Sequence, residues 1–132
     1  MFKALLISLT LASPAAFSAE SQKDIIIYTA NNDAFPLHQR CVTGVNLRED
    51  AVAWRFFPTV SLFLSIKKSP DCSDALDHFF SRNVGSDVTA TFNSDAFLKT
   101  KIVSALRTGN GYSQVVSDKA LATQILASYT RQ

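Results

Sequence analysis

An alternating stretch at residues 58–66 limits the possible folds of this chain more than any other feature. Apolar side chains occupy every second position, and hydroxyl-bearing residues and one phenylalanine fill the positions between. Successive side chains of a β-strand point to opposite faces of its sheet, so this period of two predicts a strand with one buried face. The apolar positions are Val60, Leu62, Leu64 and Ile66.

Two later segments carry apolar residues at helical spacing. The first follows Lys67-Lys68-Ser69-Pro70, and either Asp71 or Ser73 is expected to cap it. It ends at Asn83-Val84-Gly85-Ser86, where Gly85 suits a left-handed conformation. The second helix is expected to begin after Ser117. The apolar stripes are Ala75, Leu76, Phe79 and Phe80 in the first helix, and Leu121, Ala122, Ile125, Leu126 and Tyr129 in the second.

Further strands are expected at 24–30, 87–92, 96–106 and 112–116, with an extended piece at 41–47 and an irregular segment at 35–40. Turn residues at 93–95 and 108–111 separate the later strands, and the second turn is typical of a hairpin. The core order is strand, helix, strand, strand, strand, helix. We therefore expect an α+β two-layer sandwich, with two helices on one face of a mostly antiparallel sheet.

A series of segments combines strand, helix and turn residues in a fixed order: Pro58-Thr59-Val60-Ser61-Leu62, 79–85, 87–92, 101–105, 109–111 and 117–121. Through these segments, residues 58–126 resemble the head of the first periplasmic domain of SecD, a subunit of the bacterial protein-export machinery. The resemblance implies the same α+β fold and a role in contacting other polypeptides. Export coupled to a proton gradient is not implied, because this chain has no predicted membrane spans.

Residues 1–18 are typical of a secretory signal peptide. A short basic start at Lys3 precedes an apolar run at 4–17, and the small residues Ala16 and Ser18 fit cleavage after Ser18. The apolar run is shorter than the ~20 residues of a membrane-spanning helix. We therefore expect one periplasmic or secreted domain, residues 19–132.

The charge balance argues against some classes of partner. The chain has 13 basic and 11 acidic side chains, a formal net charge of +2, without a basic stripe or an acidic tail. Nucleic acids and anionic membrane surfaces are therefore not the expected partners. No apolar run after the leader is long enough to cross a bilayer.

Cys41 and Cys72 are the two cysteines of the chain. In an exported protein such a pair predicts a structural disulfide, and closing its loop would stabilise the fold by roughly 3–4 kcal/mol. The alternative is a nucleophilic cysteine with His38 or His78 as its base.

No catalytic, cofactor-binding or metal-binding constellation is expected. His38 and His78 are the two histidines, and neither belongs to a His-x-x-x-His pair. Asp71, Asp74 and Asp77 recur every three residues, which suits either a calcium site or the N-terminal end of a helix. We therefore expect a protein that is not an enzyme.

The stretch Trp54-Arg55-Phe56-Phe57 is the candidate partner-binding patch. Tryptophan and arginine are enriched at interface hot spots, so Trp54, Arg55 and Phe57 are the predicted contact residues. The alternative is an edge of the core, with the Arg55 stem packed on it and its head in water.

The sequence is compatible with two main functions and a third, less favoured one. The first is a non-enzymatic envelope module that binds another envelope protein or an extended polypeptide, which would add to an exposed sheet edge. The second is a small periplasmic inhibitor or immunity protein that blocks a toxin or cell-wall hydrolase with a loop at 31–50. A third, an enzyme, would require a polar cleft around His38 or His78.

Overall fold

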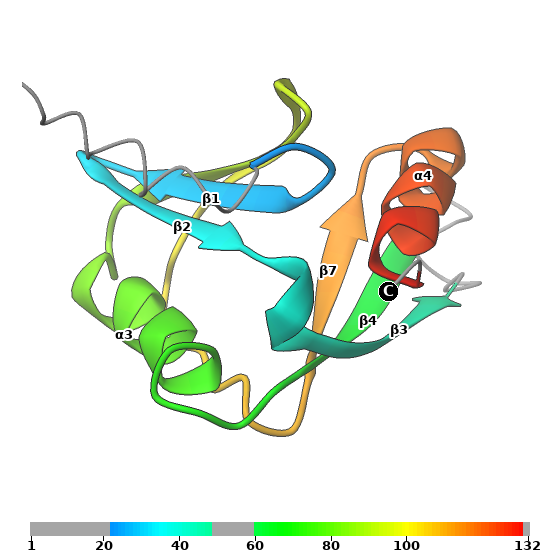
Figure 1. Ribbon diagram of the computed structural model, residues 1–132. Coiled ribbons are helices and arrows are strands. Elements are labelled where there is room, and N and C mark those ends of the chain that lie inside the picture. Colours follow the sequence, from blue (N-terminus) through cyan, green and yellow to red (C-terminus); the bar gives the residue numbers. More distant parts are fainter. Residues whose placement is uncertain (1–21, 49–59, 131–132) are drawn as a thin grey trace, which may run out of the picture.

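A computed structural model describes residues 22–48 and 60–130. These residues form two α-helices, one short 3₁₀ helix and seven strands in two antiparallel sheets, which confirms the α+β sandwich (Figure 1). The predicted leader at 1–18 lies outside the described residues.

The first sheet has four strands in the order β2-β1-β5-β6. Its hairpins turn at 31–32 and at 93–94, and the second turn is the one predicted at 93–95. Asn93 and Ser94 both have positive φ angles, 52° and 74°, as a tight two-residue hairpin requires. The strands are β1 (Ile26–Ala30), β2 (Asp33–Leu37), β5 (Asp87–Phe92) and β6 (Asp95–Lys101).

The second sheet has three strands in the order β3-β4-β7, which are β3 (Val42–Arg48), β4 (Val60–Ile66) and β7 (Tyr112–Val116). The central strand β4 is the alternating stretch of the sequence. Its apolar positions are buried and the positions between them are only partly covered, which confirms the expected alternation. Strands β3 and β4 pair as an antiparallel hairpin that residues 49–59 connect.

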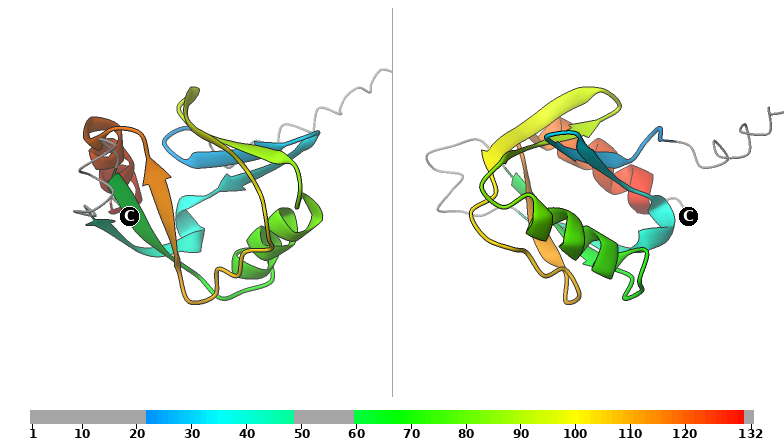
Figure 2. Two further views of the ribbon diagram at one scale, coloured as in Figure 1. Left: turned by 180° about the vertical axis from the view of Figure 1, so that it is seen from behind. Right: turned by 90° about the vertical axis from the view of Figure 1, so that its left-hand side faces the viewer.

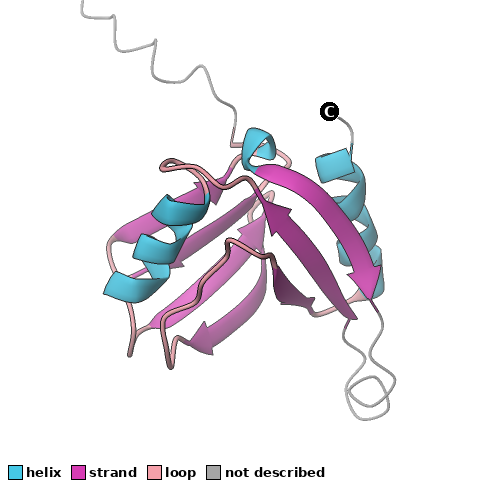
Figure 3. Cartoon of the chain, turned by 90° about the horizontal axis from the view of Figure 1, so that it is seen from below, coloured by secondary structure: helices cyan, strands magenta, loops and turns pink. Residues whose placement is uncertain are grey.

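Helices α3 (Ser73–Arg82) and α4 (Lys119–Thr130) lie on opposite sides of the molecule, with the strands between them (Figure 3). Helix α3 packs against β2, and α4 packs chiefly against β3 and β4. Each sheet therefore has its own helix, where the sequence led us to expect both helices on one sheet. The expected cap is also wrong, because Cys72 is the N-cap of α3 and makes no side-chain cap bond. The backbone N–H groups of Ser73 and Asp74 donate instead to the carbonyl groups of Lys67 and Ser69.

The division into two sheets arises after β6. The strand expected at 96–106 ends at Lys101, and backbone hydrogen bonds join Ile102 to Gly85 and Ser86. Thr108 is then fixed to α3, because its N–H and hydroxyl both donate to Asp77 Oδ1 at 2.8 Å. The turn at 108–111 is present, but β6 ends at Lys101, well before the turn begins. Strand β7 consequently pairs with β4, and the predicted hairpin with β6 is wrong.

The segment expected to be irregular, 35–40, is ordered. Residues 33–37 form β2, and η3 (Gln39–Cys41) leads into β3. The segment 31–50 was expected to provide the loop of an inhibitor. In its described part, residues 33–37 form a strand of the four-stranded sheet and residues 42–48 form a strand of the three-stranded sheet.

The two sheets incline toward each other (Figure 2), and the links between the layers include a disulfide and a buried tyrosine. The predicted disulfide between Cys41 and Cys72 is confirmed; it joins the end of η3 to the start of α3, with a Cα–Cα distance of 5.3 Å. The buried tyrosine is Tyr129 of α4. Its hydroxyl accepts from Ile26 N and donates to the Leu37 carbonyl, each at 2.7 Å.

Candidate functional site

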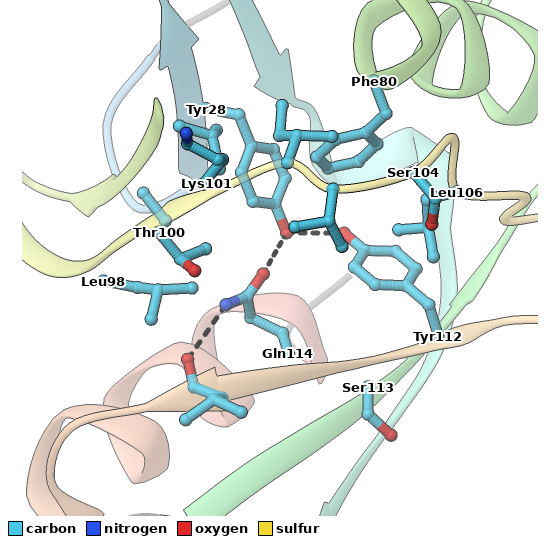
Figure 4. Close-up of a pocket in the computed structure, with 15 residues that line it drawn as sticks. Tyr28, Phe80, Leu98, Thr100, Lys101, Ser104, Leu106, Tyr112, Ser113 and Gln114 are labelled. Atoms are coloured by element: carbon cyan, nitrogen blue, oxygen red, sulfur yellow. Dashed lines mark hydrogen bonds between the residues drawn. The ribbon is translucent and has the colours of Figure 1, made fainter. Parts of the chain in front are cut away.

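An apolar pocket of about 230 Å³ lies between β6 of one sheet and β7 of the other (Figure 4). Leu98 and Thr100 project from β6, Tyr112 and Gln114 project from β7, and the chain between the strands closes one side. The remaining lining residues are Tyr28, Phe80, Val88, Ala90, Lys101, Ile102, Val103, Ser104, Leu106, Ser113 and Val115.

A buried hydrogen-bonded chain crosses the pocket and joins the two sheets. The Tyr28 hydroxyl donates to Gln114 Oε1 at 2.6 Å. A phenol has one hydrogen, so Tyr112 is the donor in the 2.6 Å contact between the two tyrosine hydroxyls. Gln114 Nε2 in turn donates to the Val115 carbonyl at 2.9 Å. Every polar group of the chain has a partner, so the pocket is rigid on this side.

Burial controls the ionisation of these phenols. Burial raises the pKa of Tyr28 well above its usual value, and the nearby Tyr112 raises it further. The pKa of Tyr112 is also raised by burial, although its hydrogen bond to Tyr28 acts in the opposite direction. Both phenols are therefore neutral near pH 7, and neither one exchanges a proton readily at that pH.

A β-bulge shapes the β6 side of the pocket. The register between β5 and β6 shifts at Ala90 and Thr91, so Leu98 pairs with Ala90 while Ala96 pairs with Thr91. Phe97 is the extra residue, and it is buried. The bulge allows Phe97 to enter the core while Leu98 lines the pocket. The strand expected at 96–106 includes both residues, but its pattern did not identify Phe97 as buried.

Two exposed valines border the pocket. Val103 is 82% exposed and Val115 is 43% exposed, which makes them two of the three large hydrophobic residues that the described surface leaves in water. The third, Val84, is 46% exposed and lies elsewhere, in the turn after α3. The apolar lining therefore continues onto the surface beside β7.

The strand at this border, β7, is the least protected edge among the described strands. Native sheets protect their edges with proline, lysine, bulges or a covering element. The other three edges have such features: Pro36 lies in β2, a bulge interrupts β3 at Val42 and Gly44, and β6 carries Lys99 and Lys101 as well as its bulge. Strand β7, Tyr-Ser-Gln-Val-Val, has no charge, no proline and no bulge.

A second, polar hollow of about 330 Å³ lies beside α3 and contains His78, Asp74, Asp77 and Arg107. Asp77 already accepts two hydrogen bonds from Thr108. Among residues 22–48 and 60–130, no hydrogen bond or ion pair engages the imidazole of His78. The hollow thus gathers ionisable groups without a base held against a nucleophile, and the expectation that the protein is not an enzyme stays a prediction.

The other residues considered as sites in the sequence are the aromatic patch, the cysteines and the possible metal ligands. Trp54, Arg55 and Phe57 lie outside the described residues, in the connection between β3 and β4. In the part of the chain that the structure describes, no cysteine is free and no group of three His, Cys, Asp or Glu side chains could hold a metal ion.

The residues that line the pocket were not identified from the sequence. A usable signal was present in β7, where Gln114 occupies an inward position between Tyr112 and Val116 in a strand without charges. A buried glutamine in such a strand indicates a polar contact inside the core.

Within the described ranges, no helix is both long enough and apolar enough to span a membrane. Comparison of the whole chain with protein-family models, with curated proteins and with solved structures finds no match.

Proposed function

We propose that this protein is an exported, non-enzymatic module that binds extended polypeptides of the cell envelope at β7. The bound segment adds to the three-stranded sheet as a fourth strand, and one of its side chains enters the pocket beside β7. This role agrees with the resemblance of residues 58–126 to the SecD head, which implies contact with other polypeptides.

The unprotected edge of β7 carries the proposal. An edge strand presents unpaired N–H and C=O groups that another chain can bond, and native proteins normally block them. Here the unblocked edge coincides with the apolar pocket and with the exposed side chain of Val115. Peptide recognition by strand addition uses this combination, with backbone bonds for affinity and a side-chain pocket for specificity.

The size of the pocket supports a side chain as its occupant. Pockets for drug-sized ligands have volumes of about 300–1,000 Å³. The volume here, about 230 Å³, is smaller, and the lining is almost entirely apolar. It suits one large aliphatic or aromatic side chain of a bound strand better than a whole metabolite.

The support around β7 is rigid. Its neighbour β4 is the central strand of the sheet, and Tyr112 and Gln114 are fixed by the hydrogen bonds to Tyr28. A preformed edge of this kind binds a peptide with less loss of conformational entropy than a mobile one.

The proposed location outside the cytoplasm has two supports. Residues 1–18 have the pattern of a cleavable leader. The disulfide between Cys41 and Cys72 is of the kind that persists in oxidising compartments.

The test is a selection of displayed random peptides of about ten residues on the oxidised domain, followed by measurement of affinity. Val115→Lys places a charge on the β7 edge, and Val84→Lys places the same charge at a position of similar exposure away from it. The proposal requires peptides with an apolar residue, bound by the protein and by Val84→Lys but at least tenfold more weakly by Val115→Lys. Equal binding by both variants, or selection of no peptide, would refute it.

A further inference from the structure

Resting on the proposed function, we infer that β7 accepts an uncharged strand with two adjacent apolar residues. The first is the anchor, which lies opposite Gln114 and enters the pocket. The second is its neighbour in the bound strand, which lies opposite Val115 on the outer face of the sheet. A strand that has polar residues on both sides of each apolar residue fits this edge less well.

The inference starts from the two faces of β7. Burial alternates along the strand: its first, third and fifth residues are buried, and Ser113 and Val115 between them are exposed. Figure 4 shows Gln114 pointing toward Tyr28 and Ser113 pointing away from it. A strand added at this edge therefore meets an inner surface at Gln114 and an outer surface at Ser113 and Val115.

The pocket determines where the anchor lies along β7. Gln114 is the inward residue of β7 that lines the pocket together with both of its neighbours in the chain. Residues directly opposite each other on two paired strands share a face of the sheet. A residue opposite Gln114 consequently points to the pocket, and the residues before and after it lie opposite Ser113 and Val115 on the outer face.

The two positions beside the anchor are not equivalent. Val115 is one of the three large hydrophobic residues that the described surface leaves exposed, whereas Ser113 presents a hydroxyl group. An apolar side chain opposite Val115 removes apolar surface of both residues from water. Such cross-strand pairs stabilise a sheet. The preference for a second apolar residue is therefore expected on one side of the anchor alone.

The charges of the three-stranded sheet favour an uncharged segment. No residue of β7 is charged, and neither is any of the β4 residues that pair with it. Arg48 lies in β3, on the other side of β4, with its guanidinium 4.6 Å from the centre of the Phe63 ring. A charged side chain of the bound strand would lose water without gaining an opposite charge from β7 or β4.

Adjacent apolar residues define a class of partner segment. Strands with one face in water alternate apolar and polar residues, whereas strands that are buried on both faces contain continuous apolar runs. The segment that β7 accepts belongs to the second class.

Ser113 and Val115 provide a matched exchange for the test. Both are exposed in β7, so the double variant Ser113→Val with Val115→Ser moves the apolar side chain to the other side of Gln114 without changing the composition. Val115→Ser alone removes that side chain. Val84→Ser is the control, because Val84 has a similar exposure and lies away from the edge.

The probes are fluorescent peptides of about ten residues, built on a peptide selected for binding. Alanine substitution identifies the anchor as the residue whose truncation weakens binding most. Valine or serine is then placed at each of the two positions beside the anchor. Dissociation constants are measured by anisotropy, with each domain in its oxidised form.

The protein and Val84→Ser should bind about two- to fivefold more tightly when valine replaces serine at one of the two positions, with little preference at the other. The preference should move to the other position in the double variant and disappear in Val115→Ser.

Equal affinities for valine and serine at both positions, or a preference that stays at the same position in the double variant, would overturn the inference and leave strand addition at β7 standing. Failure of every peptide to bind would overturn both proposals. A dimer of the domain that Val115→Lys dissociates would also overturn the inference, because a second copy would then be the occupant.

Discussion

The hydroxyl groups of Tyr28 and Tyr112 lie 2.6 Å apart, although the two residues belong to different sheets. Tyr28 stands in β1 of the four-stranded sheet, and Tyr112 begins β7 of the three-stranded sheet. Their contact continues to Gln114, so a polar chain joins the two layers beside the pocket. The stability of the site and the stability of the fold are therefore linked through these three side chains.

The first prediction separates the two tyrosines. Tyr28→Phe leaves both the Tyr112 hydroxyl and Gln114 Oε1 buried without their partner, so it should lower the free energy of unfolding by about 2 kcal/mol or more. Tyr112→Phe leaves the Tyr28–Gln114 hydrogen bond intact and should cost only about 1 kcal/mol. Urea unfolding of the two variants measures the difference. Equal losses of stability would show that the hydrogen bonds do not run from Tyr112 to Tyr28 and from Tyr28 to Gln114.

The second prediction concerns alkaline pH. The three tyrosines of the chain are Tyr28, Tyr112 and Tyr129, and burial raises the pKa of each. In the unfolded chain they lose their protons at a pH of about 10. Because the folded-state pKa values are higher, the stability is complete below that pH and decreases as the pH rises above it.

Tyrosinate absorbance should therefore increase in one cooperative step that coincides with the loss of secondary structure. The measurement is a pH titration that follows ultraviolet absorbance and circular dichroism together. Gradual ionisation of one or more tyrosines while the circular dichroism is unchanged would contradict the burial of all three.

The third prediction compares two glycines with positive φ angles. A Cβ on Gly111, whose φ is +87°, would lie 2.5 Å from the Phe63 ring, whereas a Cβ on Gly85, whose φ is +93°, meets nothing within 4 Å. Gly85→Ala should then cost only the backbone strain, about 1 kcal/mol. Gly111→Ala adds overpacking and should cost about 3 kcal/mol. Thermal unfolding distinguishes the two, and a smaller cost at Gly111 would show that its turn is packed differently.

The fourth prediction concerns the disulfide. Cys41 and Cys72 are 31 positions apart, and replacing both by alanine frees this loop in the unfolded chain. On the chain-entropy account the variant should lose about 3–4 kcal/mol of stability. Urea unfolding of the variant and of the oxidised protein gives the difference. Unchanged stability would mean that the bridge does not restrict the unfolded chain.

The sequence predicted local structure better than the arrangement of the sheets. Strict alternation identified β4, and the helical spacing of Phe79 and Ile125 identified α3 and α4. The expectation that 35–40 is irregular was wrong, because Pro36 lies in β2, and proline is tolerated at the edge position that this strand occupies.

The local sequence pattern could not predict which strands pair when they are far apart in the chain. The chain between β6 and β7 is held against α3 by two hydrogen bonds between Thr108 and Asp77, residues 31 positions apart, and β7 then pairs with β4. Nothing in the spacing near either residue predicts that contact. The pocket was missed for the same reason, since its lining comes from strands of both sheets and from the chain that crosses between them.

Amide hydrogen exchange of the folded domain, with and without a selected peptide, tests the central claim most directly. If the bound segment adds to β7, the slowed amides will be those of residues 112–116 that point away from β4, and the edges of β2, β3 and β6 will exchange as before. Slowed exchange at one of those other edges, with β7 unchanged, would contradict the account.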